Sequence, residues 1–85
     1  MNNTLIIEAK NSPEFLERLL RVCRHRGFTL NHIDAKVNVQ HKTIRMNLTV
    51  CSDREISLLT KQIEKVVGVI EVTLLPSSNN IKASA

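Results

Sequence analysis

The chain has 85 residues, of which 42% are hydrophobic, 24% are charged and only two are aromatic. These values exclude a disordered chain and a multidomain protein, and they indicate one small domain with a core of Leu, Ile and Val. The net charge of +4 is mildly basic, so nucleic acid has to be considered as a partner.

The first predicted elements are a strand and a helix. Residues 4–10 alternate loosely between apolar and polar side chains, which is typical of a short strand. Ser12 and Pro13 indicate a helix start, because a Ser oxygen accepts a hydrogen bond from an early helical N–H and Pro suits the first helical position. Gly27 is expected to end the helix. The apolar stripe between these limits consists of Phe15, Leu16, Leu19, Leu20 and Cys23.

Charged residues are distributed unevenly along this helix. Glu14 and Glu17 lie near its N-terminus, whereas basic residues lie on the solvent side and toward the C-terminus. The basic residues are Arg18, Arg21, Arg24, His25 and Arg26. Such an arrangement complements the helix dipole, with a typical gain of about 0.3–1 kcal/mol per charge. We therefore favour this electrostatic explanation over a phosphate-binding patch.

A hairpin of two strands is predicted next. The pattern is extended from Phe28 onward, but its parity changes near Asn31 and His32, which indicates a bulge or a short extended lead-in before the strand proper. Residues 40–42 form a polar tip. The apolar side carries Ile33, Ala35, Val37 and Val39 before the tip, and Ile44, Met46, Leu48 and Val50 after it. The outward side of the second strand carries Arg45, Asn47, Thr49 and Cys51.

A second helix and a last strand complete the domain. Ser52 and Glu55 match a capping box, in which each side chain satisfies the other residue's backbone N–H. The helical stripe that follows consists of Ile56, Leu59, Ile63, Val66 and Val67, and Gly68 closes it. Residues 69–75 form the final strand before Pro76. We expect one domain over residues 1–76 and a flexible C-terminal tail over residues 77–85.

The predicted order is therefore β-α-β-β-α-β. Right-handed crossovers place both helices on one face of a four-stranded antiparallel sheet, which is the ferredoxin-like arrangement of the α+β class. Because this fold hosts enzymes, metal carriers, RNA binders and ligand sensors, its function has to be inferred from particular residues.

Two kinds of chemistry common on this fold lack their residues here. An RNA-recognition motif needs aromatic side chains on the central strands, and this chain has none there. A metal carrier needs two cysteines in the loop after the first strand, and residues 11–14 contain none. His25, His32 and His41 are too scattered for a ligand set. We therefore expect no metal site.

The two cysteines indicate a reducing compartment. Cys23 and Cys51 lie far apart with no CxxC motif, so two free thiols are expected rather than a disulfide framework. Cys23 falls on the predicted apolar stripe, and neither thiol has a candidate base near it in sequence, so we expect no catalytic nucleophile. No segment resembles a signal peptide or a membrane span. The expected location is the cytoplasm, with no membrane partner.

Residues 17–28 resemble the first helix and turn of the ACT domains in acetolactate synthase small subunits, where a helix of the type L-x-R-V-x-x-x-x-x-x-R-G-[FY] leads into the second strand. The residues that match it are Leu16, Arg18, Arg26, Gly27 and Phe28. Leu19 replaces the usual Val. Residues 44–50 resemble the third strand of the family, and residues 62–72 resemble its second helix and last strand. The match covers about residues 4–75 and is most like the short small subunit of isozyme II.

This resemblance implies a regulatory ACT-domain chain that is not an enzyme by itself. Family members bind a large catalytic subunit that uses thiamine diphosphate, Mg²⁺ and FAD to condense pyruvate with a second 2-oxo acid, in the biosynthesis of valine, leucine and isoleucine. The small subunit raises catalytic activity, and in many relatives it carries feedback inhibition by valine. We therefore expect those cofactors in the partner, none in this chain, and a homodimer through the ACT domain.

The resemblance also locates a degenerate effector site. In valine-sensitive relatives the effector lies between two ACT domains, near an N-x-x-G loop after the first strand and an Asn after the R-G-[FY] turn. This chain keeps Asn11, but it has Glu14 in place of the Gly and Thr29 in place of the second Asn. Glu14 fills space that Gly leaves open and brings a negative charge toward the effector's carboxylate. The resemblance therefore implies weak or no valine feedback, and Glu14 also suits the helix N-terminus.

Two surfaces are candidates for contact with the catalytic subunit. One is the basic helix face, with Arg18, Arg21, Arg24 and Arg26. The other is the outward side of the third strand, with Arg45, Asn47 and Thr49. Two other functions stay open: a free-standing ACT domain that senses another amino acid, and, ranked last, a small basic protein that binds nucleic acid. The leading interpretation includes no nucleic-acid partner.

Overall fold

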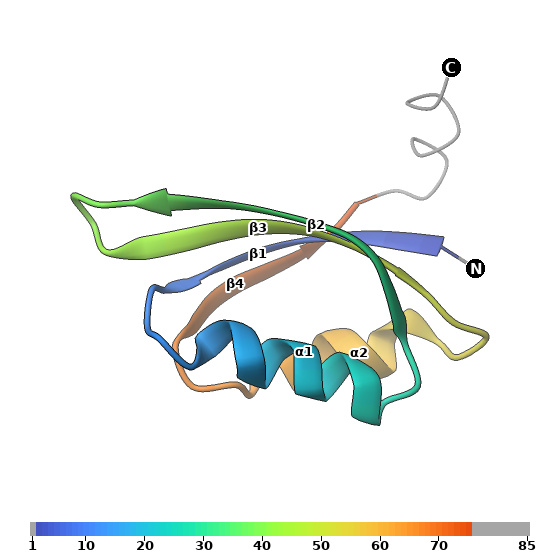
Figure 1. Cartoon of the computed structure of the whole chain (residues 1–85). Helices are drawn as coiled ribbons and strands as arrows, with labels where there is room; N and C mark the ends of the chain where they lie inside the picture. The colour runs from blue at the N-terminus through green and yellow to red at the C-terminus, as the bar shows by residue number, and fades with distance from the viewer. Residues whose placement is uncertain (1, 76–85) are drawn as a thin grey trace, which may run out of the picture.

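A computed structural model describes residues 2–75, and its elements follow the predicted order (Figure 1). The elements are β1 (Asn2–Lys10), α1 (Phe15–His25), β2 (Thr29–Asn38), β3 (Thr43–Cys51), α2 (Ile56–Glu64) and β4 (Val69–Leu74). The predicted boundary at residue 76 and the tail over residues 77–85 lie outside the described residues. No helix within residues 2–75 is long and apolar enough to cross a membrane.

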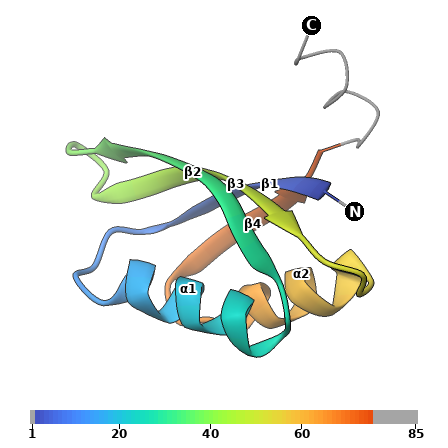
Figure 2. The same ribbon diagram turned by 45° about the vertical axis from the view of Figure 1, so that its right-hand side comes forward.

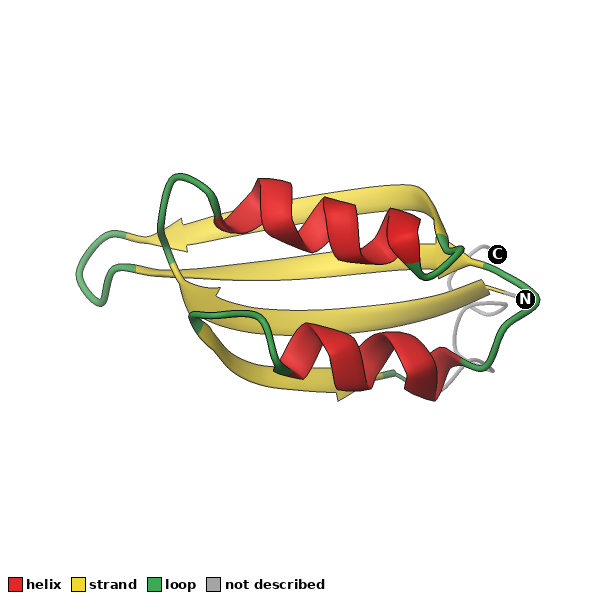
Figure 3. Cartoon of the chain, turned by 90° about the horizontal axis from the view of Figure 1, so that it is seen from below, coloured by secondary structure: helices red, strands yellow, loops and turns green. Residues whose placement is uncertain are grey.

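The four strands form one antiparallel sheet in the order β2-β3-β1-β4. Both helices lie on the same face, with α1 on the side of β2 and α2 on the side of β4 (Figure 3). Within residues 2–75 the opposite face of the sheet carries no helix (Figure 1). The predicted ferredoxin-like fold is therefore confirmed, and β2 and β4 are its edge strands.

The core lies between the helices and the two central strands. The inward residues of these strands are fully buried, as the alternation in the sequence predicted. They are Leu5, Ile7 and Ala9 on β1 and Met46, Leu48 and Val50 on β3. They pack against Phe15, Leu19 and Cys23 of α1 and against Leu59 and Ile63 of α2.

Of the two alternatives predicted for the parity change in β2, a bulge or an extended lead-in, the structure shows the bulge. The pairing of β2 with β3 shifts between Leu30 and His32, so that Leu30 lies opposite Val50 and His32 lies opposite Thr49. Beyond the bulge the register is regular as far as Asn38. The β2–β3 hairpin projects past the N-terminal end of α1 (Figure 2), so its tip has no helix beneath it.

The start of α1 differs from the prediction. The helix begins at Phe15 rather than at Pro13, and no side-chain hydrogen bond caps it among the described residues. Instead, the Phe15 amide donates to the Ser12 carbonyl oxygen at 3.2 Å. Ser12 and Pro13 thus belong to a preceding turn, because a backbone carbonyl already satisfies the amide that the Ser12 hydroxyl was expected to serve.

The predicted capping box at α2 is also wrong. The Ser52 hydroxyl accepts a hydrogen bond from the Arg54 amide at 3.0 Å, which forms a local turn before the helix. Glu55 occupies the N-cap position, and no side-chain hydrogen bond caps α2 within the described chain. The N-cap therefore lies three residues later than expected, at Glu55 rather than at Ser52, and the helix starts at Ile56.

α2 ends earlier than its apolar stripe predicted. The helix stops at Glu64, and Val67 is 77% exposed rather than part of the apolar stripe. The reason is tertiary: the Lys10 amide donates to the Gly68 carbonyl oxygen at 2.8 Å, which holds the turn against β1. One more helical turn would move Gly68 away from that strand.

Candidate functional site

The three residues of the predicted effector site do not meet within one chain. Asn11 and Glu14 lie in the loop that connects β1 to α1, whereas Thr29 is the first residue of β2, after α1 has ended. The eleven residues of α1 separate the two places, which corresponds to roughly 16 Å along the helix axis. A site that used all three positions would therefore need a second chain.

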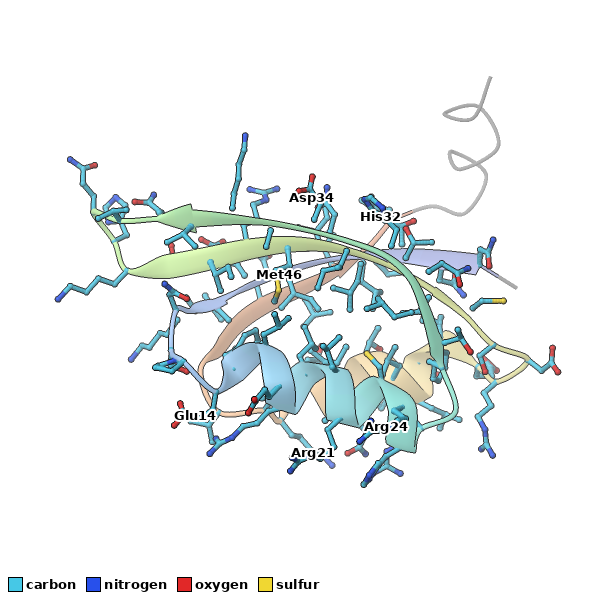
Figure 4. The ribbon with its side chains drawn as sticks, viewed as in Figure 1. Glu14, Arg21, Arg24, His32, Asp34 and Met46 are labelled. Carbon is cyan, nitrogen blue, oxygen red and sulfur yellow. The ribbon has the colours of Figure 1, made fainter. Side chains whose placement is uncertain are left out.

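The loop with Asn11 and Glu14 is tied to its neighbours by the backbone. The Asn11 amide donates to the Lys42 carbonyl oxygen at 2.9 Å, which joins the loop to the β2–β3 hairpin. Glu14 is exposed and has φ −94° and ψ −1°, the conformation typical of the third residue of a type I turn, here the turn closed by the Phe15 amide and the Ser12 carbonyl. Its carboxylate lies at the N-terminal end of α1, where negative charge is favourable (Figure 4).

The Gly27–Phe28 turn has a structural explanation. Gly27 has φ +81°, a left-handed conformation that side chains rarely tolerate, and a Cβ atom there would lie 2.9 Å from Nε of Arg54. Phe28 is 4% exposed, and its amide donates to the Cys23 carbonyl oxygen at 2.9 Å. The turn therefore closes α1 and directs Thr29 into β2.

The basic helix face is confirmed as an exposed surface. All four of its arginines are exposed: Arg18, Arg21, Arg24 and Arg26. Arg21 and Arg24 point away from the sheet (Figure 4). Because the sheet covers the other side of α1, this face remains open for a partner.

The outward residues of β3 lie in the middle of the open sheet face. In the strand pairing, Arg45 has Glu8 of β1 on one side and Lys36 of β2 on the other. Asn47 lies between Ile6 and Asp34 in the same way. The predicted outward orientation of β3 is therefore confirmed, and the face it belongs to is polar.

Thr49 is more enclosed than its two companions. It is only partly exposed, and its Oγ1 lies 3.2 Å from Oγ1 of Thr4 on β1, so one hydroxyl donates to the other. Arg45 and Asn47 are exposed. A partner that approaches this face would therefore meet Arg45 and Asn47 first.

Arg45 borders three shallow hollows on the open face. The largest, of about 510 Å³, lies at the β2–β3 hairpin. Its lining residues are Glu8, Lys36, Val37, Asn38, Val39, Gln40, Thr43 and Arg45. The lining holds both charges and contains neither a thiol nor an aromatic ring. Such a surface suits polar recognition rather than covalent chemistry or base stacking.

The thiols and histidines form no reactive cluster. Cys23 is 2% exposed, and burial raises the pKa of its thiol from 9.0 to about 11, which keeps it protonated and unreactive at neutral pH. Cys51 is partly exposed at the end of β3. Both are free, as predicted. Within residues 2–75 no three His, Cys, Asp or Glu side chains are grouped closely enough to hold a metal ion.

An apolar surface on β2 was not predicted from the sequence. Ile33 is 36% exposed and Val37 53%, although both have the parity that points toward the helix-bearing face. Val39, just after the end of β2, is 82% exposed. Leu16 on the neighbouring α1 is 40% exposed. Alternation alone could not reveal this surface, because it does not say which strand lies at the edge of the sheet.

Several proteins of similar sequence are small subunits of acetolactate synthase. The ACT-domain family profile matches residues 11–72. The acetolactate synthase isozyme 2 small subunit of Escherichia coli K12 is 37% identical over 78 residues, which cover 92% of this chain and 90% of that protein. The subunit of the same name from Shigella flexneri has the same identity and coverage.

Solved structures show the same fold. The acetolactate synthase small subunit of Thermotoga maritima superposes with a TM-score of 0.79 at 22% identity, over 91% of this chain. The present chain spans about half of that one, with 48% of its length covered. The ACT domain of the Chlorobium tepidum GTP pyrophosphokinase gives a TM-score of 0.74 at 17% identity, over 88% of this chain and 97% of that domain.

Proposed function

Because the chain belongs to the ACT-domain family of acetolactate synthase small subunits, we propose that it is the regulatory subunit of an acetolactate synthase in branched-chain amino-acid biosynthesis. The observation that carries this function is the 37% identity to a small subunit over nearly the full length of both chains. The chain itself is not catalytic. It acts by binding a large catalytic subunit and raising the activity of that subunit.

The chemistry of the reaction belongs to the large subunit in this proposal. Thiamine diphosphate, Mg²⁺ and FAD are bound there and act on pyruvate and a second 2-oxo acid. The two free thiols of this chain, Cys23 and Cys51, are compatible with the reducing cytoplasm in which such a complex would work.

A reconstitution experiment tests the regulatory function. Purified chain is added to its large subunit, and acetolactate formation is measured against each component alone. We expect activity to rise with the added chain and none from the chain by itself. Failure to co-purify and failure to activate would together contradict the subunit function and favour a free-standing amino-acid sensor.

Two exposed surfaces are candidates for the large-subunit contact. The basic helix face and the outward side of β3 lie on opposite layers of the domain, so one flat contact does not cover both. Arg21→Glu tests the first surface and Arg45→Glu tests the second, each by loss of activation. Lys61→Glu is the matched control, because Lys61 is exposed on α2 and belongs to neither surface.

The chain forms a homodimer in this proposal. The support is the edge strand β2, whose outer backbone groups and exposed apolar side chains Ile33 and Val37 are suited to pairing with another strand. Covering them would add apolar burial to a domain of only 85 residues. Sedimentation at tens of micromolar, roughly the range in which weak dimers form, should report a dimer.

Valine regulation is weak or lacking in this proposal. Glu14 places a carboxylate and a longer side chain where valine-sensitive relatives have Gly, and Thr29 offers fewer hydrogen bonds than Asn. A lost hydrogen bond to a charged group costs roughly 1.5–3 kcal/mol, which is about tenfold or more in affinity. The double change Glu14→Gly with Thr29→Asn should create or strengthen valine binding in calorimetry. Tight valine binding by the unaltered chain would contradict the proposal.

A further inference from the structure

One row across the open sheet face consists of four charged residues, one from each strand. In the order of the strands they are Lys36 on β2, Arg45 on β3, Glu8 on β1 and Glu71 on β4. Each lies directly opposite the next in the strand pairing. Three of them are exposed, and Glu8 is half-buried. The row therefore has two positive charges on one side of the midline of the sheet and two negative charges on the other.

Within one chain this row is unfavourable at two of its three contacts. Arg45 and Glu8 are an oppositely charged pair, but Lys36 lies opposite Arg45, and Glu8 lies opposite Glu71. Like charges directly opposite each other in a sheet are destabilising. Because the row has opposite signs at its two ends, it complements a copy of itself that is turned round.

We infer that the open face stacks on the open face of a second copy of the chain, the partner, around a two-fold axis that runs along the strands between β3 and β1. Such an axis reverses the order of the strands and keeps each row in place. Arg45 then lies over the partner's Glu8, and Lys36 lies over the partner's Glu71. Symmetry repeats both contacts, so every charge of the row gains an opposite charge.

The dimensions of the face suit a weak contact of this kind. Stacked sheets lie about 10 Å apart with their strands within about 30°, a gap that long charged side chains from both sides can span. Four strands about 4.8 Å apart and nine residues long give a face of roughly 600 Å². This is less than the area of about 800 Å² per partner in a standard interface. We therefore expect a weak association that salt weakens further.

Two-fold axes that run across the strands do not pair the charges. An axis at the charged row would place Lys36 over the partner's Lys36 and Glu71 over the partner's Glu71. An axis at the next row would place Asp34 over the partner's Asp34. An axis between these rows would pair Lys36 with the partner's Asp34 but leave Arg45 and Glu8 over uncharged residues. Only the axis along the strands compensates the whole row.

Stacking would also distinguish the two candidate surfaces for the large subunit. It covers Arg45 and Asn47, and it leaves the basic helix face exposed, because both helices lie on the other side of the sheet (Figure 3). It does not use the edge of β2, so it adds a second interface to the homodimer proposed above. The proposed regulatory function does not depend on it.

Charge exchange on the two central strands tests the stacked arrangement. Arg45→Glu and Glu8→Arg should each weaken association through this face by about tenfold or more, because like charges then face each other across the axis. An equimolar mixture of the two variants should associate as the unaltered chain does, and so should the double variant. Sedimentation at low salt, up to about 1 mM chain, measures this association. Lys61→Glu, on α2, is the matched control and should change nothing.

The edge of β2 is unchanged in these variants, because both substitutions lie on central strands. A dimer formed through that edge would therefore persist in all of them, and stacking is the further association step that charge exchange removes and restores. Single variants that associate as tightly as the unaltered chain would overturn the inference. So would a mixture that associates no better than the single variants.

Crosslinking tests which strands face each other. In a Cys51→Ala background, an equimolar mixture of Asp34→Cys and Thr73→Cys should be joined by a bis-maleimide that spans about 10 Å, because the axis places Asp34 over the partner's Thr73. Thr73→Cys alone is the matched control. Its two copies lie on opposite edges of the stacked sheets, about three strand spacings or roughly 14 Å apart sideways. Crosslinking of Thr73→Cys alone, without the mixed product, would overturn the arrangement.

The outcomes separate this inference from the proposed function. A chain that shows no association through this face at about 1 mM and low salt would overturn stacking, while activation of the large subunit would still be measured independently. Loss of activation by Arg45→Glu with self-association unchanged would assign the face to the large subunit and would also overturn stacking. Loss of stacking in a variant that still activates would leave the regulatory function standing.

Discussion

β2 and β3 form one hairpin with the same alternation of apolar and polar residues, but they differ in burial. Leu48 and Met46 on β3 are fully buried, whereas their direct neighbours on β2, Ile33 and Ala35, are exposed. The cause is position. β3 has a strand on each side and the helices beneath it, while β2 is an edge strand whose tip extends past α1 (Figure 1).

This difference shows that the alternation of apolar and polar residues predicts which face of the sheet a side chain lies on, but not how deeply it is buried. Alternation correctly placed the apolar residues of both strands toward the helix-bearing side. Whether such a residue is buried depends on what lies next to its strand. An apolar residue at an edge is therefore a candidate contact with another chain, whereas the same residue in a central strand contributes to the core.

We expect the largest effect from a comparison of Leu48 on β3 with its direct neighbour on β2, Ile33. Leu48→Ala should lower the free energy of unfolding by roughly 2–5 kcal/mol, because the side chain is fully buried and leaves a cavity. Ile33→Ala should cost less than about 1 kcal/mol at low protein concentration. Urea unfolding measures both. If β2 is covered by a second copy, the cost of Ile33→Ala should grow with protein concentration, and equal costs at all concentrations would contradict the contrast.

A pH dependence distinguishes the core thiol from the thiol at the end of β3. Burial raises the pKa of Cys23 from 9.0 to about 11, whereas in the unfolded chain the thiol ionises near its ordinary value. Between these two pH values the folded state holds more protons than the unfolded chain. The free energy of unfolding is therefore highest below pH 9 and falls as the pH rises toward 11. We expect a loss on the order of 3 kcal/mol, from two pKa units at about 1.4 kcal/mol each.

Two cysteine variants serve as controls for that measurement. Cys23→Ala removes the titrating group and should flatten the decline in stability above pH 9, although the smaller side chain lowers stability at every pH. Cys51→Ala leaves Cys23 in place and should retain the full decline. If both variants showed the same pH profile, another group would be responsible.

The two turns that lead into the edge strands should respond differently to an added methyl group. Gly27→Ala and Gly68→Ala both force a side chain into a left-handed conformation, at φ +81° and φ +98°, which costs about 1–2 kcal/mol. Only at Gly27 would the new Cβ press on Nε of Arg54, at 2.9 Å. Thermal unfolding should therefore show a larger loss for Gly27→Ala, unless the Arg54 side chain moves away.

The smallest expected effect lies at the tip that joins β2 and β3. Lys42 has φ +55°, a left-handed conformation that Gly adopts without strain. Lys42→Gly should raise stability by less than about 1 kcal/mol, because relief of strain is partly offset by the greater flexibility of the unfolded chain. Lys42→Val should lower it, since β-branched residues rarely adopt this conformation. Melting temperatures of the two variants measure the difference.

The helix boundaries show how local signals were overridden. Ser12 and Ser52 both have the chemistry of a helix cap, but one contributes its backbone carbonyl to a turn and the other accepts from Arg54 before the helix begins. These hydroxyl-containing residues favour turns and caps alike. Their actual role depends on where the loop must lead, which the sequence near them does not state.

The three effector positions could come together only between two copies of the chain. Asn11, Glu14 and Thr29 were identified by resemblance to a family motif, and they lie at the two ends of α1 in one chain. A helix of eleven residues keeps its ends apart, whatever the side chains at either end. Their proximity in a site therefore requires a second copy, which no pattern within one chain can show.

The sequence by itself determined the order of elements, the faces of β1 and β3, the change of parity in β2 and the turn at Gly27. Each of these depends on neighbours within a few residues, through alternation, parity or a left-handed backbone. Only the tertiary structure decided that β2 lies at an edge, that Val67 lies outside α2, and that Arg45 stands between Glu8 and Lys36. The physical reason is that strand order and the reach of the helices are set by packing between distant segments, which local periodicity does not encode.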